Sequence, residues 1–316
     1  MRLLGELDPH QYQFTLIGPS NIGAAIPGFV ARSVPTESFI AQSDTLQTAL
    51  RRRPQASMRL ALELLRDHQV DAVVSAGNTA ALMALARQLL PRAPGLKRPA
   101  ICKMLQGKAV AGVRKPVWLL DLGANIECSA QQLLQFAVMG AQLASAAPTA
   151  ADPERPVVGL LNIGAEITKG PAVLGAAAQL LDDCPAFRYC GFVEAHELFD
   201  GRADVVVSDG LLGNVALKAM EGTAAMAQHI LSEHLAQQRS KGGLRGWLVE
   251  RVLATRTLTN VYDPQGYNGA TLLGLGGVVV KSHGAADAHG YLAAVKQARA
   301  EVIADIPRRV FDLFQE

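Results

Sequence analysis

One local pattern recurs along this chain and limits the folds that are open to it. A short apolar run ends in a small polar turn that contains glycine, and an apolar segment with helical spacing follows. The turns are SAGNT at residues 75–79, DLGAN at 121–125, NIGAE at 162–166 and SDGLLGN at 208–214. Short apolar runs are typical of buried parallel strands, and strands that alternate with helices indicate an α/β fold. The sequence therefore predicts an α/β protein with a parallel sheet.

The same turns are the expected ligand site. In an open parallel sheet the carboxyl ends of the strands lie at one edge, and ligands bind there. We therefore expect the four turns to share an edge and to bind a polar ligand that contains an anion. A capped helix with a solvated lysine is the alternative, and for residues 191–222 taken alone it is the simpler one. The candidate ligand residues in and after these turns are Asn78, Thr79, Asp121, Gly123, Asn125, Asn162, Gly164, Glu166, Lys169, Asp209, Gly210, Asn214 and Lys218, with Glu194 in the charged loop before the last strand.

A fifth candidate turn follows the glycine-rich apolar run at residues 271–280, which we expect to be one strand. It contains Lys281, His283 and Gly284, and Asn268 precedes the run. A lone histidine is more often structural than catalytic. A lysine and a histidine beside flexible glycine at one strand end favour a functional role, so both interpretations stay open.

Simple patterns predict the remaining elements. We expect strands at residues 12–17, 34–40 and 70–74. Helices are expected at 55–69, 80–90, 129–144, 212–238, 244–255 and 286–303, and another that carries Lys169 and ends near residue 181. Ser57 is positioned to cap the first helix.

Several classes of function find no support in the sequence. No GxGxxG or P-loop motif is present, so we expect no dinucleotide or nucleotide cofactor and do not favour a dehydrogenase. The cysteines (Cys102, Cys128, Cys184 and Cys190) have no metal-ligand spacing, and Asp121, Asp204 and Asp209 lack the clustering of a metal site. A net charge of +2 gives no reason to expect nucleic acid binding. Without a signal peptide or a long apolar run, we expect a cytoplasmic protein.

Longer segments resemble a known family. They are SMRLALEL followed by SAGNTAALM, LLDLGANIEC, LLNIGAEITKG, GFVEAHEL, DVVVSDGLLGNVALKAMEG and YNGATLLGLGGVVVKSHGAAD, in this order. They are similar to the phosphate acyltransferases of bacterial phospholipid synthesis, the PlsX family. The similarity extends from about residue 12 to the C-terminal helix.

The resemblance implies a fold and a reaction. The fold would be a single domain over residues 1–316, three-layered (α/β/α) with a mainly parallel sheet, and related to phosphotransacetylases and isopropylmalate dehydrogenases. The reaction would move a fatty acyl group from acyl-[acyl carrier protein] to inorganic phosphate. The acyl phosphate formed would then serve phosphatidic acid synthesis. The implied roles are catalysis for Lys281, His283, Lys218 and Asn214, and substrate or phosphate binding for the other turn residues.

The resemblance also implies partners. Family members are homodimers that associate peripherally with the cytoplasmic membrane, where glycerol-3-phosphate acyltransferase is a further possible partner. A protruding helical pair at about residues 226–258 would contact the membrane or the carrier through Arg245, Trp247, Leu248 and Arg251. Because the carrier protein is acidic, basic segments such as residues 51–53 are candidates for its docking surface.

The sequence departs from the family pattern at its beginning. Members begin with a strand and a loop of the form D-x-M-G-G-D-x-x-P, and this sequence contains no such stretch before residue 12. We expect either a start placed too late or a truncated, catalytically impaired paralogue that keeps the dimer and membrane surfaces. Apart from this departure, a different function also stays open, that of a phosphotransacetylase-like enzyme that uses coenzyme A thioesters.

Overall fold

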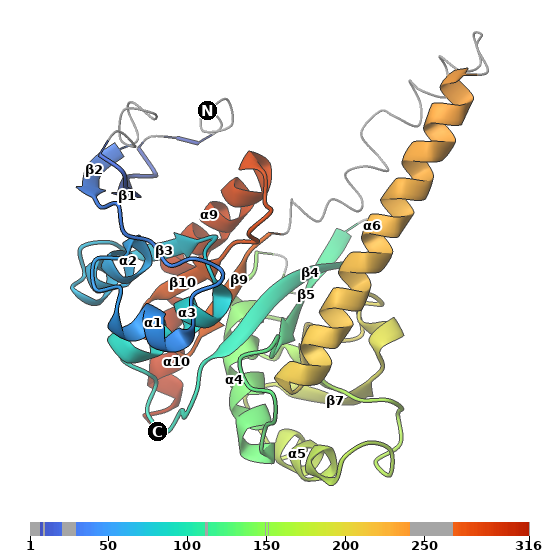
Figure 1. Ribbon diagram of the computed structural model, residues 1–316. Coiled ribbons are helices and arrows are strands. Elements are labelled where there is room, and N and C mark those ends of the chain that lie inside the picture. Colours follow the sequence, from blue (N-terminus) through green and yellow to red (C-terminus); the bar gives the residue numbers. More distant parts are fainter. Residues whose placement is uncertain are drawn as a thin grey trace.

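An eight-stranded sheet organises the molecule (Figure 1). The computed structural model describes residues 7–8, 10–20, 30–110, 113–148, 150, 152–240 and 268–315. In spatial order the strands are β3 (Ala72–Ser75), β10 (Val278–Lys281), β9 (Ala270–Leu273), β4 (Ala100–Val110), β5 (Val113–Leu120), β8 (Val205–Val207), β6 (Val157–Leu161) and β7 (Arg188–Val193). A separate parallel pair is formed by β1 (Phe14–Gly18) and β2 (Val30–Pro35).

Helices cover both faces of the sheet. One layer holds α1 (Leu46–Arg51), α2 (Ser57–Arg66), α3 (Thr79–Leu89) and the start of α6 (Gly210–Ser240), which share one apolar core with alternate residues of the strands. The other layer holds α4 (Ala130–Ala146), α5 (Ala172–Asp182), α9 (Ala288–Ile303) and α10 (Ile306–Leu313). Side chains alternate between the faces of a strand, so each central strand contributes to both cores. The predicted three-layer α/β/α architecture with a mainly parallel sheet is confirmed.

The direction of the strands changes across the sheet, and this corrects the expectation of a single ligand edge. Strands β5, β8, β6 and β7 are parallel to one another, and so are β3 and β10. Between these groups lie three antiparallel pairings, β5 with β4, β4 with β9 and β9 with β10. Three reversals leave the two parallel groups pointing in opposite directions. The turns after β5, β8 and β6 therefore leave one edge, and the turns after β3 and β10 leave the other.

The antiparallel part of the sheet contains elements that sequence reasoning missed, and α1, β7 and α10 were missed as well. β4 was not predicted, because Lys103, Gln106 and Lys108 interrupt its apolar pattern. The apolar run at 271–280 is not one strand but two, β9 and β10, which pair antiparallel. The chain reverses at Gly274, whose φ of +91° favours glycine.

Two smaller predictions about helix ends need correction. Ser57 is the first residue of α2 and does not cap it; the cap position is Ala56, which makes no side-chain hydrogen bond to the helix. Lys169 lies in the turn before α5 and not on the helix. In contrast, Asn78 caps α3 by accepting a hydrogen bond from Ala81 N at 3.0 Å. Asp209 likewise accepts a bond from Leu212 N at 2.7 Å at the start of α6.

The long helix α6 extends well beyond the body of the sheet (Figure 1). It contains the first part of the predicted helical pair. The second predicted helix, with Arg245, Trp247, Leu248 and Arg251, lies outside the described residues. Across the described ranges, each helix is too short or too polar to span a bilayer.

Two glycines of α6 allow a matched test of the packing at its start. A Cβ atom at Gly213 would lie 2.0 Å from the carbonyl oxygen of Asp121, whereas one at Gly222 would have no neighbour within 4 Å. We expect Gly213→Ala to destabilise the fold by about 1–3 kcal/mol or more, because backbone cannot move aside easily. Gly222→Ala should instead stabilise it by up to about 1 kcal/mol through helix propensity. Urea unfolding of both variants measures the difference, and equal effects would contradict this packing.

Candidate active site

A cluster of lysines forms on the face of the sheet that α6 covers. Lys103 comes from β4, Lys281 from the end of β10 and Lys218 from α6, where Glu221 lies one turn further on. Glu221 pairs with Lys218 Nζ at 2.7 Å and with Lys103 Nζ at 3.4 Å. Lys281 Nζ donates a hydrogen bond to the carbonyl oxygen of Ser282. We call Lys103, Lys218, Lys281 and Glu221 the lysine cluster.

The lysine cluster is partly desolvated and net positive. The side chain of Lys103 is only 16% exposed and that of Glu221 30%. Burial lowers the pKa of Lys281, and the positive charge of Lys218 lowers it further. Burial opposes ionisation of Glu221, yet its bonds to Lys218 and the charge of Lys103 bring its pKa below the ordinary value. Two ammonium groups therefore share the carboxylate of Glu221 and the third, on Lys281, feels the charge of Lys218, an arrangement that favours binding of a further anion.

The turn that follows Lys281 is held by a buried side chain. Asn268 donates hydrogen bonds to Ser282 Oγ at 2.7 Å and to the carbonyl oxygen of Gly290 at 2.9 Å, and accepts one from His283 N at 2.9 Å. The structure therefore gives Asn268 partners within the protein. His283 is exposed, and its Nδ1 accepts a hydrogen bond from Ala285 N at 3.1 Å. In a neutral imidazole this places the proton on Nε2, which can donate a hydrogen bond to a reacting group.

At the opposite edge of the sheet, Asp121 organises the turn after β5. It is fully buried and accepts hydrogen bonds from the backbone N–H groups of Ile101, Leu122, Ala124 and Asn125, and from Asn125 Nδ2, at 2.6–3.3 Å. Burial raises the pKa of Asp121, although the hydrogen bonds oppose the rise. Its carboxylate thus serves the turn itself and offers no exposed oxygen to a ligand.

The turn after β8 and the start of α6 pack closely against the turn that contains Asp121. Gly210 N donates to the carbonyl oxygen of Asn125 at 2.7 Å, and Asn125 Nδ2 also donates to Pro99 O at 3.0 Å. The side chain of Asn214 lies beside Gly123. Glycine at positions 123 and 210 lets these backbones approach.

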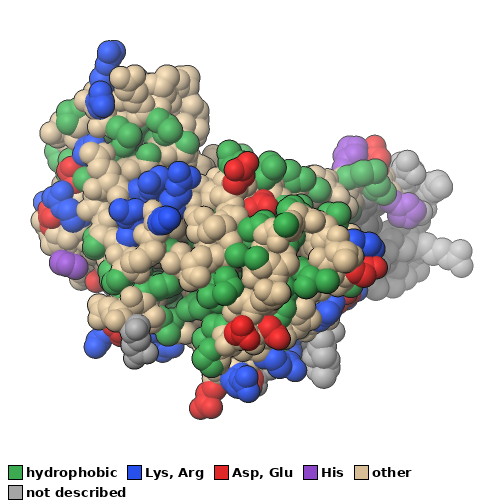
Figure 2. All heavy atoms as spheres, turned by 90° about the horizontal axis from the view of Figure 1, so that it is seen from below, with side chains coloured by type: hydrophobic (Ala, Val, Ile, Leu, Met, Phe, Trp, Pro, Cys, Tyr) green, Lys and Arg blue, Asp and Glu red, His purple; other side chains and the backbone are tan. Residues whose placement is uncertain are grey.

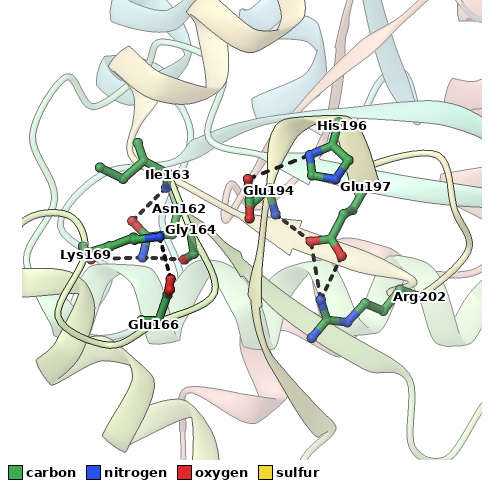
Figure 3. A network of polar contacts seen from close by, with 9 residues as sticks. All are labelled: Asn162, Ile163, Gly164, Glu166, Lys169, Glu194, His196, Glu197 and Arg202. Carbon is green, nitrogen blue, oxygen red and sulfur yellow. Dashed lines mark hydrogen bonds and ion pairs between the residues drawn. The ribbon is translucent and has the colours of Figure 1, made fainter.

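A further polar network lies at the same edge (Figure 3). Asn162 holds the turn after β6 through bonds from its Nδ2 to the carbonyl oxygens of Gly164 at 3.1 Å and Lys169 at 3.0 Å. Lys169 pairs with Glu166 at 2.8 Å, and both are exposed. Glu194 lies 3.7 Å from His196. The charge of Lys169 is therefore partly balanced within its own turn.

The predicted site residues thus fall into two groups. Lys281, His283, Gly284, Asn268, Asn78 and Thr79 belong to the edge at which β3 and β10 end. The turns after β5, β8 and β6 contain Asp121, Gly123, Asn125, Asp209, Gly210, Asn214, Asn162, Gly164, Glu166 and Lys169, and Glu194 follows β7 beside them. Lys218 lies on α6 and interacts electrostatically with Lys281. Sequence reasoning missed Lys103. The feature that could have identified it is a single charged side chain within the otherwise apolar residues 100–105.

Exposed aliphatic side chains accompany the second group. Ile126, Ile163 and Ile167 from the turns, and Leu211 and Val215 from α6, are all more than half exposed. Figure 2 views the molecule from the side where α6 begins and shows hydrophobic side chains spread among the charged ones. Leu211 and Lys218 are seven residues apart and so share one face of α6, separated by about 10 Å along its axis. Val215 lies next to this face, between them.

Comparison with solved structures identifies the fold. A phosphotransacetylase from Streptococcus pyogenes has a TM-score of 0.54 at 15% identity, covering 96% of this chain and 98% of that one. A branched-chain phosphotransacylase from Enterococcus faecalis V583 has a TM-score of 0.58 at 14% identity, covering 95% and 92%. At this identity the likeness defines the class of fold alone. The protein is an α/β protein with the phosphotransacetylase fold.

Sequence comparison defines the family. The family described as "Fatty acid synthesis protein" matches residues 5–309. A phosphate acyltransferase of Shewanella amazonensis is 46% identical over 281 residues, 88% of this chain and 79% of the relative. One of Teredinibacter turnerae is 43% identical over 307 residues, 96% and 89%. The chain belongs to the phosphate acyltransferase family and is an acyltransferase of fatty acid synthesis. Within the described ranges, no three His, Cys, Asp or Glu side chains are placed to hold a metal ion.

Proposed function

We propose that this protein transfers a fatty acyl group from acyl-[acyl carrier protein] to inorganic phosphate, giving acyl phosphate for phospholipid synthesis. The observation that carries the proposal is the lysine cluster beside an aliphatic surface on α6. Phosphate would bind among Lys103, Lys218 and Lys281. The acyl chain would lie along Leu211 and Val215, which lead away from Lys218 on the exposed surface of the helix.

The reaction needs little general-base catalysis. Inorganic phosphate is already an anion at neutral pH, so the nucleophile needs little activation by a base. One phosphate oxygen attacks the thioester carbonyl, the C–S bond breaks, and the thiolate leaves with the proton that the phosphate gives up. The ammonium groups hold phosphate in place and offset its charge, and positioning of this kind supplies about 7–11 kcal/mol in favourable cases. We assign His283 Nε2–H to a hydrogen bond that stabilises the leaving sulfur, which takes up the proton released by phosphate.

A second candidate exists for the identity of the acyl donor. The phosphotransacetylase fold favours coenzyme A thioesters as the second candidate. Exposed Arg51 and Arg52, at the end of α1, favour an acidic carrier protein, because complementary charge speeds docking. Arg53 is less available, since it pairs with Asp44 at 3.6 Å.

A direct assay separates these candidates. Phosphate-dependent loss of the acyl group would be measured with acyl-[acyl carrier protein] and with the same acyl group on coenzyme A. We expect kcat/KM to be at least about tenfold higher for the carrier substrate, and Arg51→Glu with Arg52→Glu to abolish that preference. Equal or better use of coenzyme A would contradict the donor assignment. Inactivity with both donors would instead favour a catalytically impaired paralogue.

Homodimer formation and peripheral membrane association are further parts of the proposal. Exposed Met226 and Ile230 on the extended part of α6 support an apolar contact there. Their spacing places them near one face of the helix. A cytoplasmic location at the membrane surface, beside glycerol-3-phosphate acyltransferase, would follow from the same assignment.

A further inference from the structure

A cavity of about 360 Å³ lies on the other side of the sheet from the lysine cluster. Its walls are largely apolar and come from β4, β5, the end of α4 and one side of α9, including Met104, Trp118, Leu143, Leu292 and Ala293. Met104 follows Lys103 on β4, and successive side chains of a strand point to opposite faces. The sheet therefore separates this cavity from the lysine cluster, and we call it the α9 cavity.

Two buried polar atoms in the wall of the α9 cavity have no partner. Glu301 is 4% exposed, and Trp118 is 7% exposed. Glu301 Oε1 accepts hydrogen bonds from Thr271 Oγ1 at 2.5 Å and Gln297 Nε2 at 3.0 Å. Among the residues that the structure describes, nothing bonds to Glu301 Oε2 or to Trp118 Nε1. A buried polar atom without a partner costs about 1–3 kcal/mol, so both atoms favour a ligand that can bond to them.

The chemistry of these atoms limits the ligand. The indole N–H is a donor only, and the carboxyl oxygen accepts when ionised and donates when protonated. A hydroxyl or amide group both donates and accepts, so it can serve either atom. Burial raises the pKa of Glu301 to about 7. At pH 8 the group is mostly charged and would repel a carboxylate inside the cavity. The remaining polar residues of the wall are Asn268, His289, Lys296 and Gln297, of which Lys296 is an exposed cation.

We propose that the α9 cavity is a second ligand site, distinct from the lysine cluster, for an uncharged aliphatic molecule that carries a hydroxyl or amide group. At about 30 Å³ per water-sized group, the cavity has room for roughly a dozen or more such groups. This size suits a chain of about eight carbons with its polar end. The proposal does not depend on the transfer reaction or on its acyl donor.

Calorimetric titration of the full chain with octanamide tests the site. We expect saturable binding with one site per chain. Ala293→Phe should weaken it at least about tenfold by filling the cavity, whereas Ala288→Phe, on the same helix but outside the wall, should leave it unchanged. Trp118→Phe keeps the packing but loses the N–H donor, and should weaken binding about two- to tenfold. At pH 8 octanoate should bind at least about tenfold more weakly than octanamide.

A second measurement covers the case in which a variant does not fold. The chain has two tryptophans, so Trp247→Phe leaves Trp118 as the reporter within the cavity. Octanamide should then change its fluorescence with the same midpoint as the calorimetric titration. No saturable signal in either experiment, equal binding of octanoate at pH 8, or equal loss in Ala288→Phe would overturn the proposal.

Discussion

Lys281→Met should lower kcat/KM for phosphate by about ten- to a hundredfold while the fold remains intact. The lost ammonium group lies in a partly desolvated cluster, where a hydrogen bond to a charged group contributes about 1.5–3 kcal/mol. Methionine keeps much of the aliphatic stem, so packing at the end of β10 should change little. Steady-state rates at varied phosphate measure the effect, and the KM for the acyl donor should change much less than the KM for phosphate.

The pH dependence of the same rate provides an independent check. Burial and the charge of Lys218 lower the pKa of Lys281 from 10.5, so this side chain loses its charge at a lower pH than an ordinary lysine. Affinity for phosphate should therefore fall as pH rises through that lowered pKa, and the alkaline decline should be absent in Lys281→Met. Lys97→Met is the matched control, because Lys97 is exposed in the loop before β4. An unchanged phosphate KM in Lys281→Met would remove this lysine from the site.

Asp121→Ala should destabilise the protein by about 4 kcal/mol or more. Asp121 is fully buried, and its removal leaves the backbone N–H groups of Ile101, Ala124 and Asn125 without an acceptor. Leu122 N keeps the carbonyl oxygen of Ile101, and Asn125 Nδ2 keeps that of Pro99. Each buried donor left unsatisfied costs about 1–3 kcal/mol, although some relaxation and water entry will reduce the sum. The midpoint of urea unfolding should therefore fall steeply, and α6 should lose part of its fixed start because Gly210 packs on this turn.

Substitution of an exposed aspartate is the control that distinguishes loss of buried hydrogen bonds from loss of a negative charge. Asp71, just before β3, is exposed, and Asp71→Ala should change the free energy of unfolding by no more than about 0.5 kcal/mol. Asp121→Asn keeps the shape of the side chain but replaces one acceptor oxygen with a donor, so its cost should lie between the two. If Asp121→Ala were as stable as Asp71→Ala, the turn would not depend on the carboxylate.

Much of the site was foreseeable because its signals are local. A strand that ends in a glycine turn before a helix can be read from a dozen residues, and Lys281, His283 and Lys218 lie in or just after such turns. The structural roles of Asp121, Asn125, Asn162 and Asn268 were less foreseeable. A polar side chain in a turn looks the same in sequence whether it bonds to a ligand or to the backbone around it, and the structure gives these four the backbone.

By itself, the sequence determined the α/β class, the family and the turns that carry polar chemistry, since each depends on residues close together in the chain. Only the tertiary structure decided which turns share an edge. The direction of a strand depends on its pairing partner, and the antiparallel pairings of β4 and β9 join residues far apart in sequence. The same long-range pairing brings Lys103 to Glu221 across 118 residues of chain. No local pattern encodes such a contact, because it is set by the packing of the whole sheet against α6.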